Sequence, residues 1–485
     1  MNAAMTPRKH RAGWTRRGFL AGGAKGLAGA ACAAPWLRGA PLPGKLPPNE
    51  RISVGLIGIG MMGSGHLRRL ANDPKCEVRA VCDVDRVRRE TAQTAADAIA
   101  ARKTRSGERR SCKAHADFRE LLARDDIDAV LIAAPDHWHA ALAIAAARSG
   151  KDAYLEKPVS LTVEEGRRIV ETVQLYKRVF QTGTQYRSIP AIRKVCEFVR
   201  RGGLGKIKSV FTQLFPLGDW ISQPRCRPYA RALDPSRCGA LYTPVDFALP
   251  EEPVPEGLDW EMWVGPAPWR PYNRLYHVNP KPGVVPWSFD WAFGAASNTW
   301  FLSHAADVIQ YALGMERSGP VEIIHPDSGR FPTLTLRYAN GTLLHFIRDW
   351  NQVKKLYGAV PPKARLAGMF GGVFVGERGW LTSMTNGGPI EGEPPELFQK
   401  MGLQNREVNA GRNNHHDNWL RCIRARGKPS ASEELGHRAA CLGHLINIAL
   451  WTGKSLRWDP EKERFSNCAA ANRLLSRPTR APWHL

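Results

Sequence analysis

Short apolar runs alternate with amphipathic segments over residues 51–175. The apolar runs end near Gly58, Asp83, Pro135 and Lys157. A helical pattern follows the first run, and after Pro135 apolar residues again recur at helical spacing. Continuous apolar strands separated by helices are typical of a parallel sheet that is covered on both faces. The pattern therefore predicts an α/β domain over residues 51–175.

This rhythm is lost after about residue 176. Stretches rich in proline and tryptophan, such as 249–273, interrupt the chain, and apolar and polar residues alternate within 333–350. Alternation is typical of half-buried strands, and Asn340-Gly341 is a strong hairpin signal. We expect a second, sheet-based domain over residues 176–485. The proline-rich residues 41–50 are interpreted as a linker.

The first apolar run ends in a glycine motif. Gly58, Gly60 and Gly63 form G-x-G-x-x-G between a predicted strand and a predicted helix. In this setting the first glycine permits a tight turn, the second admits a pyrophosphate close to the backbone, and the third lets helix and strand pack closely. The amide groups of the helix N-terminus would then face the phosphates. The motif predicts a dinucleotide-binding Rossmann domain in which Ile59, Met61 and Met62 share the phosphate loop.

The second apolar run ends in Asp83. A carboxylate at this position accepts hydrogen bonds from the ribose hydroxyls of an adenosine and repels a 2′-phosphate. Asp83 therefore favours NAD. NADP stays open as an alternative, because Arg86, Arg88 and Arg89 follow directly.

Two further apolar runs end in polar residues. The loop Pro135–His139 follows one predicted strand, and Glu156 and Lys157 follow the next. Ligands bind at the carboxyl ends of strands in open parallel sheets, so these residues are candidates for the nicotinamide side. For His139, and for His137 beside it, capping of the helix is the structural alternative.

Charge and composition bound the class of protein. The chain has 485 residues, of which 43% are hydrophobic and 24% are charged, with a formal net charge of +24. The densest basic run, residues 101–113, lacks aromatic residues and lies in no recognisable nucleic-acid module, so it is interpreted as a solvated loop. We expect a soluble, globular protein with no nucleic-acid partner.

Residues 1–40 have the order of an export signal. Arg16 and Arg17 precede a mildly apolar stretch rich in glycine and alanine, and small residues follow. The stretch is too short and too polar for a membrane span. The paired arginines, followed by Gly18, Phe19 and Leu20, resemble a twin-arginine signal, whose pathway exports folded proteins. We expect a periplasmic protein that uses the twin-arginine translocation machinery. Lipidation at Cys32 is a minority alternative.

The ten cysteines show no CxxC pair and no metal-like spacing to histidines. No metal site is therefore predicted. In an oxidising compartment, Cys226 and Cys238 are candidates for a disulfide bond.

The motifs together resemble the Gfo/Idh/MocA oxidoreductase family. The resemblance rests on the glycine loop, on the strand ending in Asp83, on the loop Pro135–His139 and above all on residues 150–170 around Glu156-Lys157-Pro158. It extends over about residues 51–485. It implies a Rossmann domain followed by an α+β domain with an open, mostly antiparallel sheet, and a homo-oligomer. It also implies that Lys157 hydrogen-bonds the reacting oxygen. We expect a cis peptide bond between Lys157 and Pro158.

A second catalytic element in this family is D-x-x-x-H-x-x-D, which His304 and Asp307 match. Trp300 occupies the position of the first acid. The resemblance implies that His304 is a general acid/base, and the residue that orients it is left open. It also places Tyr186 and Arg187, with Asp307, at the substrate, and matches His415 to a family histidine that capping explains equally well. Candidates for stacking against a sugar ring are Trp263, Trp269, Tyr272, Trp287 and Trp291, each with core packing as the alternative.

Three functions compete at this stage. The leading one is oxidation of a secondary alcohol on a sugar, glycoside or polyol with a tightly held NAD. The second is glycoside hydrolysis through oxidation, elimination and reduction, without the two carboxylates of ordinary glycosidases. The third is a nucleotide-bound protein that binds sugars without turnover, which the missing acid before His304 favours.

Overall fold

The computed structural model describes residues 51–103, 111–214, 249–278, 286–384, 389–403 and 414–485. The predicted export signal, the linker, Cys32, Cys226 and Cys238 lie outside the described residues. Within the described ranges, none of the helices combines the length and the apolar character that a membrane crossing requires.

The first domain contains a parallel sheet with the strand order β3-β2-β1-β4-β5-β6. Its strands are β1 Ile52–Ile57, β2 Cys76–Cys82, β3 Lys113–His115, β4 Ala129–Ile132, β5 Asp152–Leu155 and β6 Phe180–Thr182. Every neighbouring pair is parallel, as the continuous apolar runs predicted. The sheet takes one strand more than the predicted boundary at residue 175 allowed, because the short apolar run at β6 pairs with β5.

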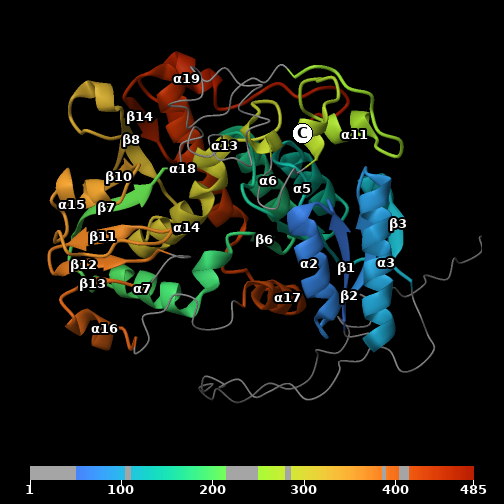
Figure 1. The fold of residues 1–485 in the computed structure, drawn as a ribbon, viewed down its shortest axis with the longest axis horizontal. Helices are drawn as coiled ribbons and strands as arrows, with labels where there is room; N and C mark the ends of the chain where they lie inside the picture. The colour runs from blue at the N-terminus through green and yellow to red at the C-terminus, as the bar shows by residue number, and fades with distance from the viewer. Residues whose placement is uncertain (1–50, 104–110, 215–248, 279–285, 385–388, 404–413) are drawn as a thin grey trace, which may run out of the picture. The chain divides into compact units, whose positions relative to one another are not determined.

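Helices connect these strands. They are α2 Met61–Asn72, α3 Arg86–Lys103, α4 Phe118–Leu122, α5 His139–Arg148 and α6 Val163–Leu175, with a 3-10 turn, η2, at Asp136–Trp138. Thr162 caps α6 by accepting the Glu165 N–H. Figure 1 shows α2 and α3 beside β1 and β2. This arrangement brings the carboxyl ends of β1, β2, β4 and β5 to one edge of the sheet.

The second domain contains a sheet with the strand order β13-β12-β11-β7-β10-β9-β8-β14-β15. Its strands are β7 Ile207–Gln213, β8 Pro320–Ile324, β9 Thr335–Tyr338, β10 Leu343–Ile347, β11 Val373–Gly376, β12 Gly379–Thr382, β13 Gly392–Glu393, β14 Leu456–Asp459 and β15 Arg464–Phe465. Among the described strands of this sheet, β7 and β10 are the only parallel neighbours. The predicted open, mostly antiparallel sheet is confirmed. The predicted hairpin at Asn340-Gly341 joins β9 to β10, with Gly341 at φ 88°.

Three helices pack with this sheet around the largest core cluster: α7 Pro190–Arg200, α14 Leu302–Leu313 and α18 Glu433–Thr452. Figure 1 shows α14 next to β11, and α7 below α14 on the side of β12 and β13. Shorter helices are α11 Trp260–Val264, α12 Arg274–His277, α13 Ala296–Trp300, α15 Asn351–Lys355, α16 Glu396–Lys400, α17 His415–Ala425 and α19 Ala469–Arg473, and 3-10 turns are η3 Gln185–Ser188, η5 Pro286–Phe289 and η6 Pro326–Ser328. Trp419 and Leu420 of α17 join the core beneath the parallel sheet.

Candidate active site

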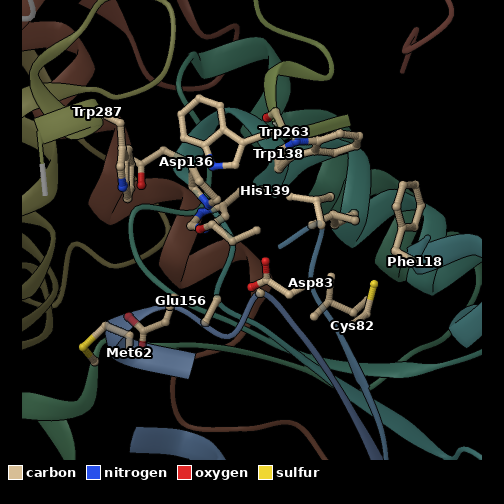
Figure 2. A pocket seen from close by; sticks show the side chains of 18 of the residues that line it. Met62, Cys82, Asp83, Phe118, Asp136, Trp138, His139, Glu156, Trp263 and Trp287 are labelled. Carbon is tan, nitrogen blue, oxygen red and sulfur yellow. Dashed lines mark hydrogen bonds between the residues drawn. The ribbon is translucent and has the colours of Figure 1, made fainter. Parts of the chain in front are cut away.

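A cavity lies at the carboxyl edge of the parallel sheet. It encloses about 1070 Å³ of space, including its open mouth. Residues from both domains line it. Figure 2 shows Asp83, Asp136, His139 and Glu156 around this cavity, together with Trp138, Trp263 and Trp287. Of the predicted cofactor residues, Gly58, Gly60, Met61, Met62, Asp83, Pro135, His139, Glu156 and Lys157 line it.

The glycine loop has the space that a phosphate requires. Gly58 has φ 85°, and a Cβ there would lie 2.6 Å from the Ala134 backbone nitrogen. A Cβ on Gly63 would lie 2.0 Å from the Gly58 carbonyl oxygen, so helix α2 packs against the loop as predicted. A Cβ on Gly60 would meet nothing within 4 Å, and Gly60 borders the cavity. This loop fits the pyrophosphate of a dinucleotide.

Asp83 is buried where it borders the cavity. Its Oδ2 accepts the Ile59 N–H at 2.7 Å, and its Oδ1 accepts the Asp85 N–H at 3.0 Å. Burial raises the pKa of Asp83, and the charge of Arg88 and the two N–H donors oppose this rise. Ile59 and Gly63 do not line the cavity within the described part of the chain, and Ile59 contributes its amide to Asp83 instead.

The three arginines that made NADP an alternative cofactor contact other groups of the protein. Arg86 pairs with Glu256 at 3.0 Å. Arg88 donates to the His277 carbonyl oxygen at 3.0 Å and borders the cavity. Arg89 donates to the carbonyl oxygen of Asp83 at 3.3 Å. With Asp83 facing the cavity, these contacts agree with NAD as the cofactor.

His137 and His139 both contact backbone oxygens through both ring nitrogens. Nδ1 of His139 lies 2.5 Å from the Pro158 carbonyl oxygen, and its Nε2 lies 2.9 Å from the Ala134 carbonyl oxygen. Burial lowers its pKa. Nε2 of His137 lies 2.9 Å from the Trp263 carbonyl oxygen. His139 therefore borders the cavity, and its two ring contacts link the loop after β4 to the turn after β5.

Lys157 is half-buried at the end of β5 and borders the cavity. The peptide bond to Pro158 is cis, as predicted. Nζ of Lys157 lies 3.5 Å from the centre of the Trp300 ring, within the range of a cation–π interaction. Burial lowers the pKa of Lys157, while the carboxylates of Glu156 and Asp136 oppose this effect. A lysine in this environment exchanges a proton more readily near neutral pH than a solvated one.

Glu156 is fixed in place by several groups. Its Oε1 accepts from His66 Nε2 at 2.9 Å and from Gln185 Nε2 at 2.9 Å. Nδ1 of His66 lies 3.0 Å from Nε2 of His416, whose ring stacks on Tyr154. Burial alone would raise the pKa of Glu156, but the bond to His66 and the nearby positive charges lower it to about 2. Glu156 therefore remains a carboxylate across the physiological range.

His304 is not among the described residues that line the cavity. Its ring lies edge-on to Tyr186, with ring centres 4.5 Å apart, and 5.5 Å from the ring centre of Phe370. Its Nδ1 is buried without a hydrogen-bond partner among the described residues. Burial and then the charge of Lys157 lower its pKa to about 3. An imidazole with so low a pKa is a weak base at neutral pH. Its predicted catalytic role stays a prediction.

Arg187 and Asp307, both predicted to bind substrate, bind each other. Arg187 Nε donates to Asp307 Oδ2 at 2.6 Å, and its Nη2 donates to Glu316 at 2.9 Å. The Arg187 side chain is 5% exposed and that of Asp307 is 1% exposed. This burial favours a structural role for the pair over a substrate contact. Tyr186, the third predicted substrate residue, packs on His304.

The remaining predicted residues separate into different environments. Trp263 and Trp287 line the cavity, and Tyr272 lies in the aromatic core, edge-on to Trp260. Trp291 packs edge-on against Trp451 beside a second, smaller pocket. Trp269 is exposed beneath Arg480. His415 contacts Ser188 Oγ and the Thr182 carbonyl oxygen, both at 2.8 Å, which supports the packing alternative.

Part of the cavity wall consists of residues for which the sequence predicted no role. Asp136 and Trp138 come from the predicted loop after β4, and Trp300 stands where the family motif has an acid. Met262 and His277 come from the proline- and tryptophan-rich stretch and its continuation. Asp136 lies in the predicted loop Pro135–His139, at the carboxyl end of a strand where ligands bind. The functional prediction for that loop rested on its histidines instead. The placement of Trp300 depends on contacts between distant segments.

Family comparisons cover most of the chain. Residues 52–184 match the Gfo/Idh/MocA oxidoreductase family with an NAD-binding Rossmann fold, and residues 243–354 and 402–485 match the C-terminal alpha/beta domain of that family. A "Glycosyl hydrolase family 109 protein" of Shewanella pealeana is 36% identical over 131 residues, which is 27% of each chain. An "Inositol 2-dehydrogenase" of Salmonella paratyphi B is 34% identical over 157 residues, which is 32% of this chain and 43% of the relative.

The aligned part thus spans between about a quarter and less than half of these curated relatives. Among solved structures, levoglucosan dehydrogenase in complex with NADH and levoglucosan is similar with a TM-score of 0.51. It is 17% identical, and the match covers 84% of this chain and 99% of that one. This similarity supports the two-domain fold. The glycine loop, the buried Asp83 and the two family matches lead to one conclusion: the chain belongs to the Gfo/Idh/MocA oxidoreductase family and has an NAD-binding Rossmann domain.

Proposed function

We propose that the protein is an NAD-dependent oxidoreductase that acts on a secondary alcohol of a sugar, glycoside or polyol. One observation carries the proposal: the glycine loop, Asp83 and Lys157 border the same cavity at the carboxyl edge of the parallel sheet. The partial match to an inositol dehydrogenase supports a polyhydroxylated substrate. The tryptophans in the cavity wall, Trp263 and Trp287, suit the apolar face of a sugar ring.

The residues divide the work between binding and proton transfer. Gly58 and Gly60 would hold the pyrophosphate, and Asp83 the ribose of the adenosine. NAD supplies the hydride acceptor when it is bound. Nζ of Lys157 would hydrogen-bond the substrate hydroxyl and accept its proton, because burial favours the neutral amine. His304, away from the cavity wall, would support Tyr186 rather than touch the alcohol.

The proposed setting is the periplasm, with export through the twin-arginine machinery. It rests on Arg16 and Arg17 and on the small-residue stretch that follows them. Because free NAD is scarce outside the cytoplasm, we expect NAD to be acquired before export and held tightly. Fractionation of the native host that finds the protein in the cytoplasm alone, with residues 1–40 retained, would refute this part.

The enzymatic proposal has a direct test. Purified protein is denatured, and the released nucleotide is identified by chromatography; NAD or NADH is expected in near-stoichiometric amount. Absorbance of NADH is then followed across a panel of sugars, glycosides and polyols. Lys157→Met should lose activity by at least about a hundredfold, while Lys113→Met, on an exposed edge strand, should not. Protein without nucleotide and without activity on any panel member would overturn the proposal.

A second candidate function is glycoside cleavage by oxidation, elimination and reduction. It is favoured by the match to a glycosyl hydrolase family 109 protein, which covers only 27% of the chain. Release of the aglycone without net NADH formation would distinguish it from a dehydrogenase. Binding of glycosides to nucleotide-loaded protein with neither product would instead support the predicted sugar-binding protein without turnover.

A further inference from the structure

The position before His304 that carries an acid in the family motif is occupied by Trp300, so the site lacks that carboxyl group. Another carboxyl group borders the same cavity. Asp136 begins the 3-10 turn after β4 and is 1% exposed. It lines the cavity together with Lys157 and Trp300, and Figure 2 shows it among the aromatic residues of the wall. The sequence pattern gave no role to this residue.

The surrounding described residues do not satisfy both carboxylate oxygens of Asp136. The backbone of Ala295 donates a hydrogen bond to its carboxyl group, but Oδ2 is buried with no partner among the described residues. A buried acceptor without a partner is costly, at about 1–3 kcal/mol. Such an atom in a cavity wall is therefore expected to serve a bound group or a charge in the cavity.

The other charged groups near Lys157 are already engaged. Glu156, the next residue, accepts from His66 and Gln185. His139 in α5 and His304 in α14 lie close enough for the charge of Lys157 to act on them, and neither contributes a negative charge. Arg477, from the C-terminal segment, lies near Asp136 and favours its ionised form. Asp136 is thus the cavity carboxyl group available to respond to the charge of Lys157.

We propose that Asp136 is the charge partner of Lys157 across the cavity and supplies the carboxyl group that position 300 lacks. The described residues show no direct ion pair between the two side chains, so the coupling acts through the space of the cavity. Asp136 is a positioning residue in this assignment: it acts on the reaction by setting the protonation of Lys157.

The surroundings of the two groups support this assignment. Burial raises the pKa of Asp136 and lowers the pKa of Lys157, and each charge acts on the other. Burial therefore brings the proton affinities of the two groups closer together than those of a solvated aspartate and a solvated lysine. The role in turnover rests on the proposed function. In that reaction the substrate O–H bond would break and an N–H bond would form on Lys157 Nζ, while NAD, when bound, would supply the acceptor for the carbinol hydrogen and its electron pair. The Asp136 carboxylate then offsets the new ammonium charge.

The inference can be tested without turnover. The full chain, as purified, is acetylated with trace acetic anhydride at a series of pH values, and labelling of Lys157 is quantified by peptide mass spectrometry. Only the neutral amine reacts, so the midpoint reports the pKa of Lys157. Asp136→Asn should lower this midpoint by about one pH unit and raise labelling about tenfold at pH values below the midpoint. Asp125→Asn, an exposed aspartate of the same domain, should leave the midpoint unchanged.

Further variants keep the test decisive. Asp136→Glu should return the midpoint close to that of the original chain. If Asp136→Asn does not fold, Asp136→Ser removes the carboxyl group with a smaller side chain and should give the same shift. An unchanged midpoint in a folded variant without the carboxyl group overturns the inference. A shifted midpoint in a protein that oxidises no alcohol would refute the proposed function and leave the charge coupling standing.

Discussion

The ammonium group of Lys157 lies on the face of Trp300, 3.5 Å from the ring centre. The indole thus occupies the sequence position of an acid and still interacts favourably with the positive charge. Unlike a carboxyl group, the indole cannot accept the proton of Lys157. It can therefore stabilise the ammonium form without taking part in proton transfer. The relationship links the turn after β5 to α13, two segments that are distant in the sequence.

Removing the indole should make Lys157 a weaker base. In Trp300→Leu the ammonium loses a partly desolvated cation–π interaction of about 2 kcal/mol, equivalent to about 1.5 pH units. Because the neutral amine is the active form in the proposed function, the rise of kcat/KM with pH should move to lower pH by about that amount. Trp300→Phe keeps a ring and should show a smaller shift. A profile that does not move in Trp300→Leu would contradict the interaction.

Two glycines in α2 differ in the space around them, so one can test the packing of the nucleotide loop and the other can serve as its control. A Cβ on Gly63 would lie 2.0 Å from the Gly58 carbonyl oxygen, whereas a Cβ on Gly65 meets nothing within 4 Å. Gly63→Ala should therefore cost about 1–3 kcal/mol of stability and reduce the NAD that copurifies. Gly65→Ala should be neutral or stabilising by up to about 1 kcal/mol, since alanine favours helices. Urea unfolding and nucleotide content measure both effects, and equal behaviour of the two variants would refute this packing.

The buried Glu156 should make stability depend on pH in acid. Its pKa falls from 4.5 to about 2, because the His66 bond and nearby positive charges outweigh burial. A carboxylate with a lowered pKa stabilises the fold above its unfolded pKa, and this contribution disappears as pH falls toward 2. The unfolding free energies of the original chain and Glu156→Gln should differ by up to about 3 kcal/mol at pH 6 and converge only as the pH falls to about 2. Glu171→Gln, at an exposed position, should show no such convergence.

A variant of the buried pair Arg187 and Asp307 can distinguish a structural role of the pair from a contact with the substrate. Asp307→Asn leaves the guanidinium group buried with Glu316 as its remaining acidic partner, so stability should fall by about 3 kcal/mol. If the pair is structural, KM for a responsive substrate stays within about twofold. A large rise in KM at unchanged stability would restore the predicted substrate contact. Asp327→Asn, with a side chain that is 82% exposed, serves as the control.

The sequence predicted best what depends on local pattern. The parallel strands, the glycine turn, the position of Asp83 and the hairpin at Asn340-Gly341 follow from residue spacing and backbone preferences. The last parallel strand was missed because β6, Phe180–Thr182, is too short for a clear pattern. Asp307 matched a motif, yet its partner Arg187 comes from another element. Burial of His304 behind Tyr186, and the approach of Trp300 to Lys157, depend on tertiary packing that spacing does not encode.

The hydrogen bond from Ile59 to Asp83 ties cofactor choice to the order of the phosphate loop. Any redesign toward NADP that simply replaces this aspartate would also leave the Ile59 backbone amide of the loop without its acceptor. A successful redesign would therefore need two features at once: a cation for the extra phosphate and a new acceptor for the Ile59 amide. Selection for a change of cofactor would have to find both in combination, which makes this chain's commitment to NAD difficult to reverse by single substitutions.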